Sequence, residues 1–212
     1  MQALHSNGFE VHVAVRPGTP ADKLSPFKQD HHLKIVEVDL SNKDEVIAKT
    51  HGLDAIVSAL AGDDKVFVGL QRNLLEAAKA NHHKLFIPSE FGGDYDALAP
   101  NYGFLGFKAM LKEEVIKSGV PACFVRNGMF YEYSFSPLFH FDWVNGKVTV
   151  LGDGNTKIAR TKISDVGKAV GKQTRNTSKF QDFKSNLNIQ IFHANSSHSE
   201  DTKSSSESIC FQ

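Results

Sequence analysis

Short apolar runs alternate along the chain with longer stretches whose apolar residues recur at helical spacing. Five runs rich in Val, Ile, Leu and Phe predict buried parallel strands at residues 11–16, 33–38, 54–60, 84–88 and 122–126. Helices are predicted between them, at residues 41–50, 66–80 and 107–117, and Gly119 ends the last one. This alternation indicates βαβ units, so the predicted fold class is α/β with a doubly wound, Rossmann-like parallel sheet.

The N-terminal end departs from that pattern. Residues 1–6 resemble the last turns of a helix closed by Asn7-Gly8, and no G-x-G-x-x-G turn stands before Val11. A doubly wound domain opens with a strand and a glycine-rich turn, and in the common strand order that strand lies in the middle of the sheet. We therefore expect the first strand and the turn to be missing. Their loss leaves two unpaired strand edges facing a gap and removes the helix N-terminus that binds a pyrophosphate.

The C-terminal third follows a weaker pattern. Residues 147–151 and 157–161 predict a strand pair joined by Gly152-Asp-Gly154, with a short helix from Ser164 and a further strand at 187–192. From residue 194 the chain becomes polar and rich in serine. Such a composition buries too little apolar area to order itself, so residues 194–212 are predicted to form a disordered tail.

Composition and charge exclude several classes of partner. The chain carries 24 basic and 24 acidic residues among 212, so its charge indicates neither nucleic acid nor an anionic membrane as a partner. No apolar run approaches the ~20 residues of a membrane span, and the first residues lack the pattern of a signal peptide. Cys123 lies in an apolar run, where a buried thiol is the expected state. We expect a cytoplasmic protein.

Three stretches carry specific motifs. The first is Lys84-Leu-Phe-Ile-Pro-Ser-Glu-Phe-Gly92, preceded by the helical run at residues 71–80. The second is Phe107-Lys108, which opens a helix, and the third is Arg126-Asn-Gly-Met-Phe130. Further matches follow at Leu151-Gly-Asp-Gly-Asn155 and Asp165-Val-Gly167. Together, over roughly residues 1 to 170, they resemble the isoflavone reductase-like and NmrA-like branch of the atypical short-chain dehydrogenase/reductases.

The resemblance implies an organisation and a function. It implies an NAD(P)-binding domain at residues 1–135 that is incomplete at its N-terminus, and a partial substrate-binding subdomain at 136–193. It implies an NADPH-dependent reductase that acts on a small aromatic or phenolic molecule by hydride transfer. Two alternatives stay open. One is a non-catalytic NmrA-like regulator that binds a dinucleotide and then a partner protein, and the other is an inactive truncated fragment.

Candidate cofactor contacts stand at the carboxyl ends of the predicted strands, where open α/β sheets bind ligands. Arg16 ends the first strand, and an arginine there favours the 2′-phosphate of NADP over the 2′-hydroxyl of NAD. The alternative is a solvated arginine at a strand end. Lys23 is a second candidate for the phosphate. Ser58, Ala59 and Leu60 end the third strand, where small residues let the backbone approach a cofactor or pack under a loop.

The fourth strand ends in the most specific motif. The resemblance places Pro88, Ser89 and Phe91 of this motif beside the nicotinamide and its ribose. Glu90 lies between them, and an ordinary carboxylate at a helix start is an equally good interpretation of it.

Lys108 is the candidate acid/base. Typical short-chain enzymes place Tyr-x-x-x-Lys on one helical face, so that the lysine lowers the pKa of the tyrosine. Here the fourth residue before Lys108 is Phe104, and Tyr102 is predicted off that face. The resemblance implies that the lysine alone holds the nicotinamide ribose and acts as acid/base. The alternative is a solvated lysine on an amphipathic helix.

The remaining candidates are aromatic residues and histidines. The resemblance implies an apolar substrate pocket lined by Gly128, Met129, Phe130 and Tyr133. Aromatic residues further on, at 135, 139, 141 and 143, have the alternative interpretation of core residues. The pairs His31-His32 and His82-His83 are predicted to be exposed turn residues, and no metal site is expected.

Overall fold

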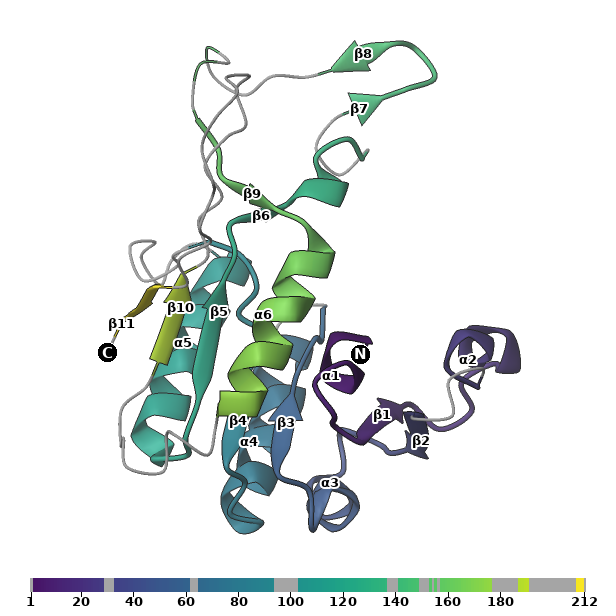
Figure 1. The fold of residues 1–212 in the computed structure, drawn as a ribbon, viewed down its shortest axis with the longest axis vertical. Helices are drawn as coiled ribbons and strands as arrows, with labels where there is room; N and C mark the ends of the chain where they lie inside the picture. Colours follow the sequence, from purple (N-terminus) through teal and green to yellow (C-terminus); the bar gives the residue numbers. More distant parts are fainter. Residues whose placement is uncertain are drawn as a thin grey trace.

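The computed structural model describes residues 2–28, 33–61, 65–93, 103–136, 141–148, 153, 155, 157–176, 187–190 and 209–211 (Figure 1). All five strands predicted from the apolar runs form, each within a few residues of its predicted bounds. They are β1 (Val11–Val15), β2 (Leu33–Glu37), β3 (Ala55–Val57), β4 (Leu85–Ile87) and β5 (Cys123–Arg126). All their ladders with one another are parallel, as βαβ connections require. The described chain is therefore an α/β protein with parallel strands.

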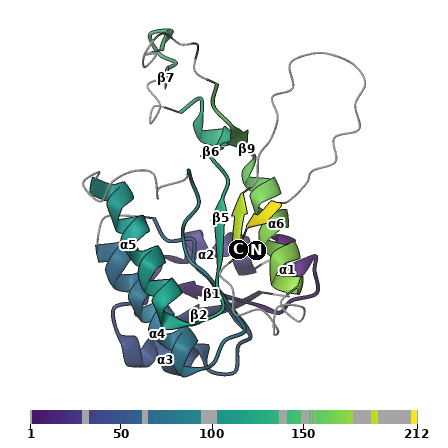
Figure 2. The ribbon, with the colours of Figure 1, turned by 90° about the vertical axis from the view of Figure 1, so that its left-hand side faces the viewer.

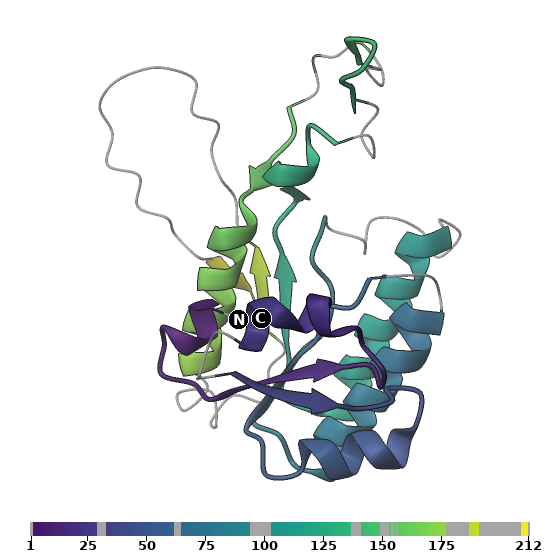
Figure 3. The ribbon, with the colours of Figure 1, turned by 90° about the vertical axis from the view of Figure 1, so that its right-hand side faces the viewer.

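The strands fall into two groups. Strand β1 pairs with β2, and β3 pairs with β4, which reaches β5 through the bridge between Phe86 and Ala122. Among the described residues no ladder joins β1 to β3. Figure 3 shows the β1–β2 pair running in a different direction from β5. Strands β1 and β2 are only partly buried, whereas every residue of β4 and β5 is buried.

The helices follow the predicted order, with one addition. They are α1 (Gln2–His5), α2 (Ala21–Lys28), α3 (Lys43–Thr50), α4 (Gln71–Ala80), α5 (Gly103–Ser118) and α6 (Ile163–Arg175). Asn42 caps α3 by accepting a hydrogen bond from the Glu45 N–H, and Gly119 ends α5 with a φ of 72°. The sequence pattern misses α2, whose sequence ADKLSPFK has little amphipathic character and contains a proline. None of the helices in the described part of the chain combines the length and apolarity of a membrane span.

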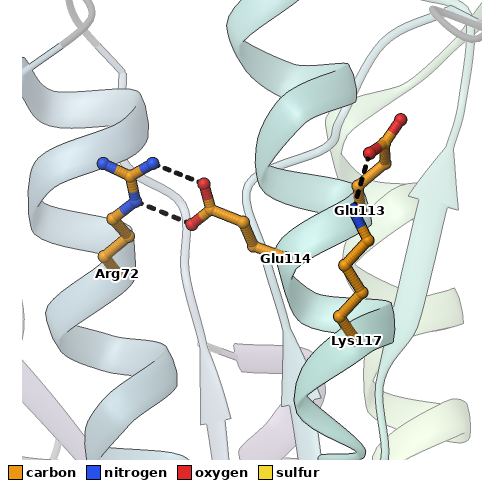
Figure 4. Close-up of polar contacts among 4 residues, drawn as sticks. All are labelled: Arg72, Glu113, Glu114 and Lys117. Atoms are coloured by element: carbon orange, nitrogen blue, oxygen red, sulfur yellow. Dashed lines mark hydrogen bonds and ion pairs between the residues drawn. The ribbon is translucent and has the colours of Figure 1, made fainter.

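Two helices differ from the prediction in type or in bounds. The segment predicted as one helix over residues 66–80 begins as a π-helix at Lys65–Leu70 and continues as α4. Helix α5 begins earlier than predicted, at Gly103. Arg72 of α4 and Glu114 of α5 form a two-pronged ion pair, with Arg72 Nε at 2.7 Å from Glu114 Oε2 (Figure 4). A second pair on α5, between Lys117 and Glu113, faces away from α4.

The core lies on both sides of β4 and β5. Helices α3, α4 and α5 cover one face of the strands, and α1 and α6 cover the other (Figure 2). Because successive side chains of a strand point to opposite faces, the strands divide their residues between two apolar clusters. Phe86 and Phe124 pack with α3, α4 and α5, whereas Ile87 and Val125 pack with Val166 of α6. This packing on both faces fixes the carboxyl ends of β4 and β5 relative to the surrounding helices.

The segment after β5 pairs differently from the prediction. Among the described residues of the predicted strand pair between 147–151 and 157–161, the two segments do not pair with each other. Instead β8 (Lys147–Val148) pairs antiparallel with β7 (Phe141–Asp142), and β9 (Arg160–Thr161) pairs parallel with β6 (Met129–Phe130). The predicted short helix is α6, which is longer than expected. Figure 1 shows β7 and β8 projecting away from the helices.

Apolar side chains on this projection are largely exposed. Phe135, Phe141 and Trp143 contact one another through their rings, but Trp143 is 68% exposed and Phe135 is 42% exposed. The interpretation of these two residues as core is therefore wrong. Phe139 lies outside the described residues.

Near the C-terminus, β10 (Leu187–Gln190) forms where a strand is predicted and pairs parallel with β5. Within the predicted disordered tail, residues Ile209–Phe211 form β11, antiparallel to β10. This differs from the expectation for those three residues. Residues 191–208 lie outside the described part of the chain, so the tail as a whole stays a prediction.

Candidate functional site

Hydrogen bonds connect the ends of β3 and β4 at the edge of the strands where the cofactor is predicted to bind. The Ser89 hydroxyl donates to the Leu60 carbonyl at 2.7 Å, and the Ser89 N–H donates to Gln71 Oε1 at 2.6 Å. Ser89 and Gln71 are both buried. The first turn of α4 and the two strand ends therefore hold the turn of residues 88–91 in one place. Gln71 has a positioning role that the sequence does not reveal, because its contact with Ser89 depends on the packing of α4 beside β4.

Lys108 lies on α5 with its amine inside the protein. The residue is only 4% exposed, and Nζ donates a hydrogen bond to the Phe91 carbonyl at 3.0 Å. The alternative of a solvated surface lysine is therefore wrong. Burial lowers the pKa of the Lys108 ammonium, and the Glu90 carboxylate opposes this effect by raising the pKa. An amine with a lowered pKa exchanges a proton more readily near neutral pH.

Glu90 is the second residue whose role the sequence leaves open. No helix starts at this position: the Glu90 N–H donates to the Pro88 carbonyl at 2.8 Å, which closes a tight turn. The residue is 1% exposed. A carboxylate is almost never buried so completely unless a charge or hydrogen bonds compensate it. Nothing in the local sequence predicts this burial, because it results from α5 packing over the turn.

The predicted substrate residues lie next to this turn. The Gly128 N–H donates to the Gly92 carbonyl at 2.9 Å, which connects the end of β5 to the motif after β4. The Phe130 ring lies 6.5 Å from that of Phe91 and 5.8 Å from that of Tyr133, between ring centroids. Gly128 and Phe130 are partly buried, as is Met129, while Tyr133 is exposed. An aromatic surface therefore adjoins the turn that anchors Lys108.

Gly128 is required by its backbone. Its φ is 66°, and a Cβ at this position would lie 2.9 Å from the Ala159 carbonyl oxygen. The next strand of the site, β9, is held by the Thr161 hydroxyl, which donates to the Asn127 carbonyl at 2.7 Å. The loop after β5 is thus fixed against β9 rather than free to move with substrate.

The two residues predicted to bind the adenosine end of the cofactor lie apart from the residue 88–91 turn. Arg16 follows β1, and Lys23 lies in the first turn of α2; both are exposed. The hydrogen bonds and ring contacts that connect the residue 88–91 turn, Lys108 and Phe130 do not include them. Figure 1 shows β1, β2 and α2 at one side of the molecule and β4, β5 and α5 at the other.

The end of β3 contributes a buried hydroxyl. Ser58 is buried, and its Oγ has no hydrogen-bond partner among the described residues. Its backbone N–H continues the ladder by donating to the Ile87 carbonyl at 2.8 Å. Ala59 is exposed and Leu60 is partly buried. An unmet buried hydrogen bond costs about 1–3 kcal/mol, so this hydroxyl fits a site where a bound molecule would supply an acceptor.

The histidines do not form part of this site. His83 is buried, and its Nε2 lies 2.9 Å from the Thr50 carbonyl oxygen, so the prediction of an exposed residue is wrong for it. His82 is exposed with a φ of 53°. His31 and His32 lie outside the described residues. Within the described ranges no three His, Cys, Asp or Glu residues are grouped as metal ligands.

Known proteins that are similar to this chain show which family it belongs to. The NAD(P)H-binding family matches residues 1–134, and the chain belongs to this family. Within it, the chain is homologous to the pinoresinol-lariciresinol and isoflavone reductases, the branch of the atypical short-chain dehydrogenase/reductases that its motifs resemble.

Three relatives illustrate the similarity. The bifunctional pinoresinol-lariciresinol reductase of Linum usitatissimum is 30% identical over 180 residues, which cover 78% of this chain and 57% of the reductase. A chain from crystal structures of pinoresinol-lariciresinol and phenylcoumaran benzylic ether reductases is 26% identical with a TM-score of 0.71, over 90% of this chain and 64% of that one. AtPrR2 with NADP⁺ and (+)pinoresinol is 23% identical with a TM-score of 0.68, over 89% and 64%, and shows the same fold. The chain spans little more than half of the flax reductase.

Proposed function

We propose that this chain is the larger part of an NADPH-dependent reductase of a small aromatic or phenolic molecule, with Lys108 as its acid/base. The observation that carries the proposal is the buried Lys108 amine, anchored to the Phe91 carbonyl at 3.0 Å beside the ring of Phe130. Pinoresinol, the ligand in the AtPrR2 structure, is such a phenolic molecule. The reduced nicotinamide would supply the hydride. Lys108 would donate the proton that the reduced substrate requires, at Nζ.

NADP(H) fits the residues along the strand ends. We assign its nicotinamide end to Pro88, Ser89 and Phe91, next to the buried Ser58 hydroxyl that lacks a partner among the described residues. The adenosine end would lie at Arg16, whose exposed guanidinium suits a 2′-phosphate. Lys23 would add a second positive charge.

The choice of cofactor is tested by Arg16→Ala. Removing a bidentate contact to a phosphate costs about 1.5–3 kcal/mol, so NADPH affinity should fall roughly 10- to 100-fold while NADH affinity stays unchanged. Arg175→Ala is the control, because Arg175 is also exposed but stands at the far end of α6. Equal losses for NADPH and NADH would contradict the assignment.

Catalysis is tested by comparing two lysines of α5. Lys108→Met should lower NADPH oxidation by about 10²–10⁴-fold with any phenolic ether or carbonyl that turns over, because the proton donor is lost. Lys112→Met is the matched control: Lys112 lies one helical turn on, is also buried, and stacks 5.8 Å from the centroid of the Phe124 ring. Equal activity of the two variants would overturn the role of Lys108. NADPH binding without turnover across the panel would favour a non-catalytic dinucleotide-binding regulator.

A further inference from the structure

Glu90 lies in the tight turn that also anchors Lys108. Its carboxylate belongs to a residue that is 1% exposed, and Lys108 is 4% exposed. The carbonyl that accepts the Lys108 hydrogen bond is that of Phe91, the next residue along the chain. The buried acid and the carbonyl that anchors the buried amine therefore belong to consecutive residues of one turn, after the end of β4 and beside α5.

Burial makes the two charges dependent on each other. Removing an isolated carboxylate or ammonium from water costs several kcal/mol, and an opposite charge nearby offsets part of that cost. Burial alone would favour a neutral lysine and a protonated glutamate. The pair can instead keep both charges, since each supplies the counter-charge of the other. The net effect on Lys108 is still a lowered pKa, because burial is the larger influence and Glu90 the opposing one.

Among the residues that the structure describes, the other charged groups around Lys108 do not replace Glu90. Lys112 follows one turn later on α5 and lies over the Phe124 ring. On α4 the facing residue Gln71 is neutral, and Arg72 is engaged with Glu114. Arg126, at the end of β5, is a buried cation and could only disfavour an ammonium. Glu90 is the charged residue that raises the pKa of Lys108.

We propose that Glu90 is a positioning residue that keeps Lys108 an ammonium ion inside the site and holds it against the Phe91 carbonyl. This inference rests on the proposed function, because it supplies the protonated state in which Lys108 would act as the proton donor. Glu90 itself need not touch the substrate. Its effect is to extend the pH range over which the donor carries its proton.

Direct titration of Lys108 tests the proposal without any need for turnover. In protein labelled with ¹³C,¹⁵N-lysine, the Lys108 Cε and Nζ resonances are assigned from Lys108→Arg and followed against pH. Glu90→Gln should move the midpoint down by about 1 to 3 pH units, because an opposite charge within several ångströms is removed. Glu113→Gln is the matched control: Glu113 lies on α5 with Lys108, but its side chain is 71% exposed and pairs with Lys117. An unchanged Lys108 midpoint in Glu90→Gln overturns the proposal.

A reciprocal measurement covers the case in which Glu90→Gln does not fold. Electrostatic coupling is symmetric, so Lys108→Met should raise the titration midpoint of the Glu90 carboxyl, followed in protein labelled with ¹³C-glutamate, by a similar amount. A Glu90 midpoint that does not rise overturns the proposal in the same way. Glu90→Asp retains the charge and should keep the Lys108 midpoint closer to that of the unaltered protein than Glu90→Gln does.

The same variants separate this inference from the proposed function. In an active protein, Glu90→Gln should move the high-pH limb of the rate profile to lower pH by the change seen in the Lys108 titration. Coupled titrations without turnover on any substrate would leave the Glu90–Lys108 pair established and reject the reductase. Turnover that depends on Lys108, with uncoupled titrations, would support the reductase and reject the role of Glu90.

Discussion

The contact between α1 and α6 offers a sharp test of the fold, because two glycines of α6 face the same short helix. A Cβ at Gly171 would lie 2.6 Å from the Ala3 carbonyl oxygen and 2.8 Å from Asn7 Nδ2. A Cβ at Gly167 would meet only the Ala3 Cβ, at 3.7 Å, which is an ordinary contact. Gly171→Ala should therefore displace α1, whereas Gly167→Ala should be accommodated.

The magnitude follows from what holds α1 in place. Leu4 is partly buried against the cluster beneath α6, which is worth about 1 kcal/mol for half of a leucine side chain. The new Cβ at position 171 would also crowd both atoms of a hydrogen bond within this segment, from the Asn7 amide to the Ala3 carbonyl at 2.7 Å, and losing that bond costs about 1 kcal/mol. Displacing α1 forfeits at most the sum, about 2 kcal/mol, because the short helix detaches before the core deforms. Both substitutions gain about 1 kcal/mol from replacing a helical glycine, so this gain cancels in their comparison.

Urea unfolding of the two variants measures the difference. Gly171→Ala should be less stable than Gly167→Ala by about 2 kcal/mol, which corresponds to midpoints roughly 1 M apart in urea. Hydrogen exchange should also become faster in residues 2–8 of Gly171→Ala and stay unchanged in Gly167→Ala. Equal midpoints together with equal exchange would show that α1 does not pack on α6 as the structure places it.

Three further outcomes are expected. A double-mutant cycle on Arg72→Ala and Glu114→Ala should give a coupling of about 0.5–1 kcal/mol that salt weakens. The hydrogen bond from Arg72 lowers the pKa of Glu114 below its ordinary 4.5. The coupling energy should therefore be complete above pH 4.5 and should disappear as the pH falls through the lowered pKa of Glu114, measured by urea unfolding at each pH. Leu111→Ala should cost about 2–5 kcal/mol of unfolding free energy in the same assay, against about 0.5 kcal/mol for its exposed neighbour Met110→Ala. Gln71→Ala should cost about 1–3 kcal/mol by leaving a buried N–H at the end of β4 without its acceptor, against no more than about 0.5 kcal/mol for Glu76→Ala, an exposed position on the same helix.

Part of the candidate site can be predicted from the sequence, and the residues that cannot be predicted are missed for one common reason. Sequence reasoning selects Pro88, Ser89, Phe91 and Lys108, because strand ends and a motif can be found along the chain. It leaves Glu90 undecided, because burial of that residue depends on a helix that follows after an intervening stretch. Gln71 is missed for the same reason: its acceptor oxygen meets Ser89 N only when α4 and β4 are packed together.

The positions of individual side chains outside the motifs required the tertiary structure as well. His83 follows a turn and has the composition of an exposed residue, yet it is buried at the C-terminal end of α3. Trp143 and Phe135 are apolar like core residues, yet both are exposed, Trp143 on the projecting β7–β8 hairpin and Phe135 ahead of it along the chain. Exposure is set by what lies above a residue in space, which a single sequence does not contain.

The sequence by itself determined the strands, most of the helices, their alternation and the family. The spacing of hydrophobic residues and the glycines that end helices are local properties of the chain. Five short apolar runs that alternate with helical segments therefore suffice to predict the five parallel strands β1 to β5. The tertiary structure alone decided which strands pair after β5, where β6 joins β9 and β7 joins β8. It also decided that Lys108 and Glu90 are both buried, with the Lys108 amine bonded to the carbonyl of the residue that follows Glu90. Pairing partners and burial depend on contacts between distant segments, whose free energies appear only when the whole chain is packed.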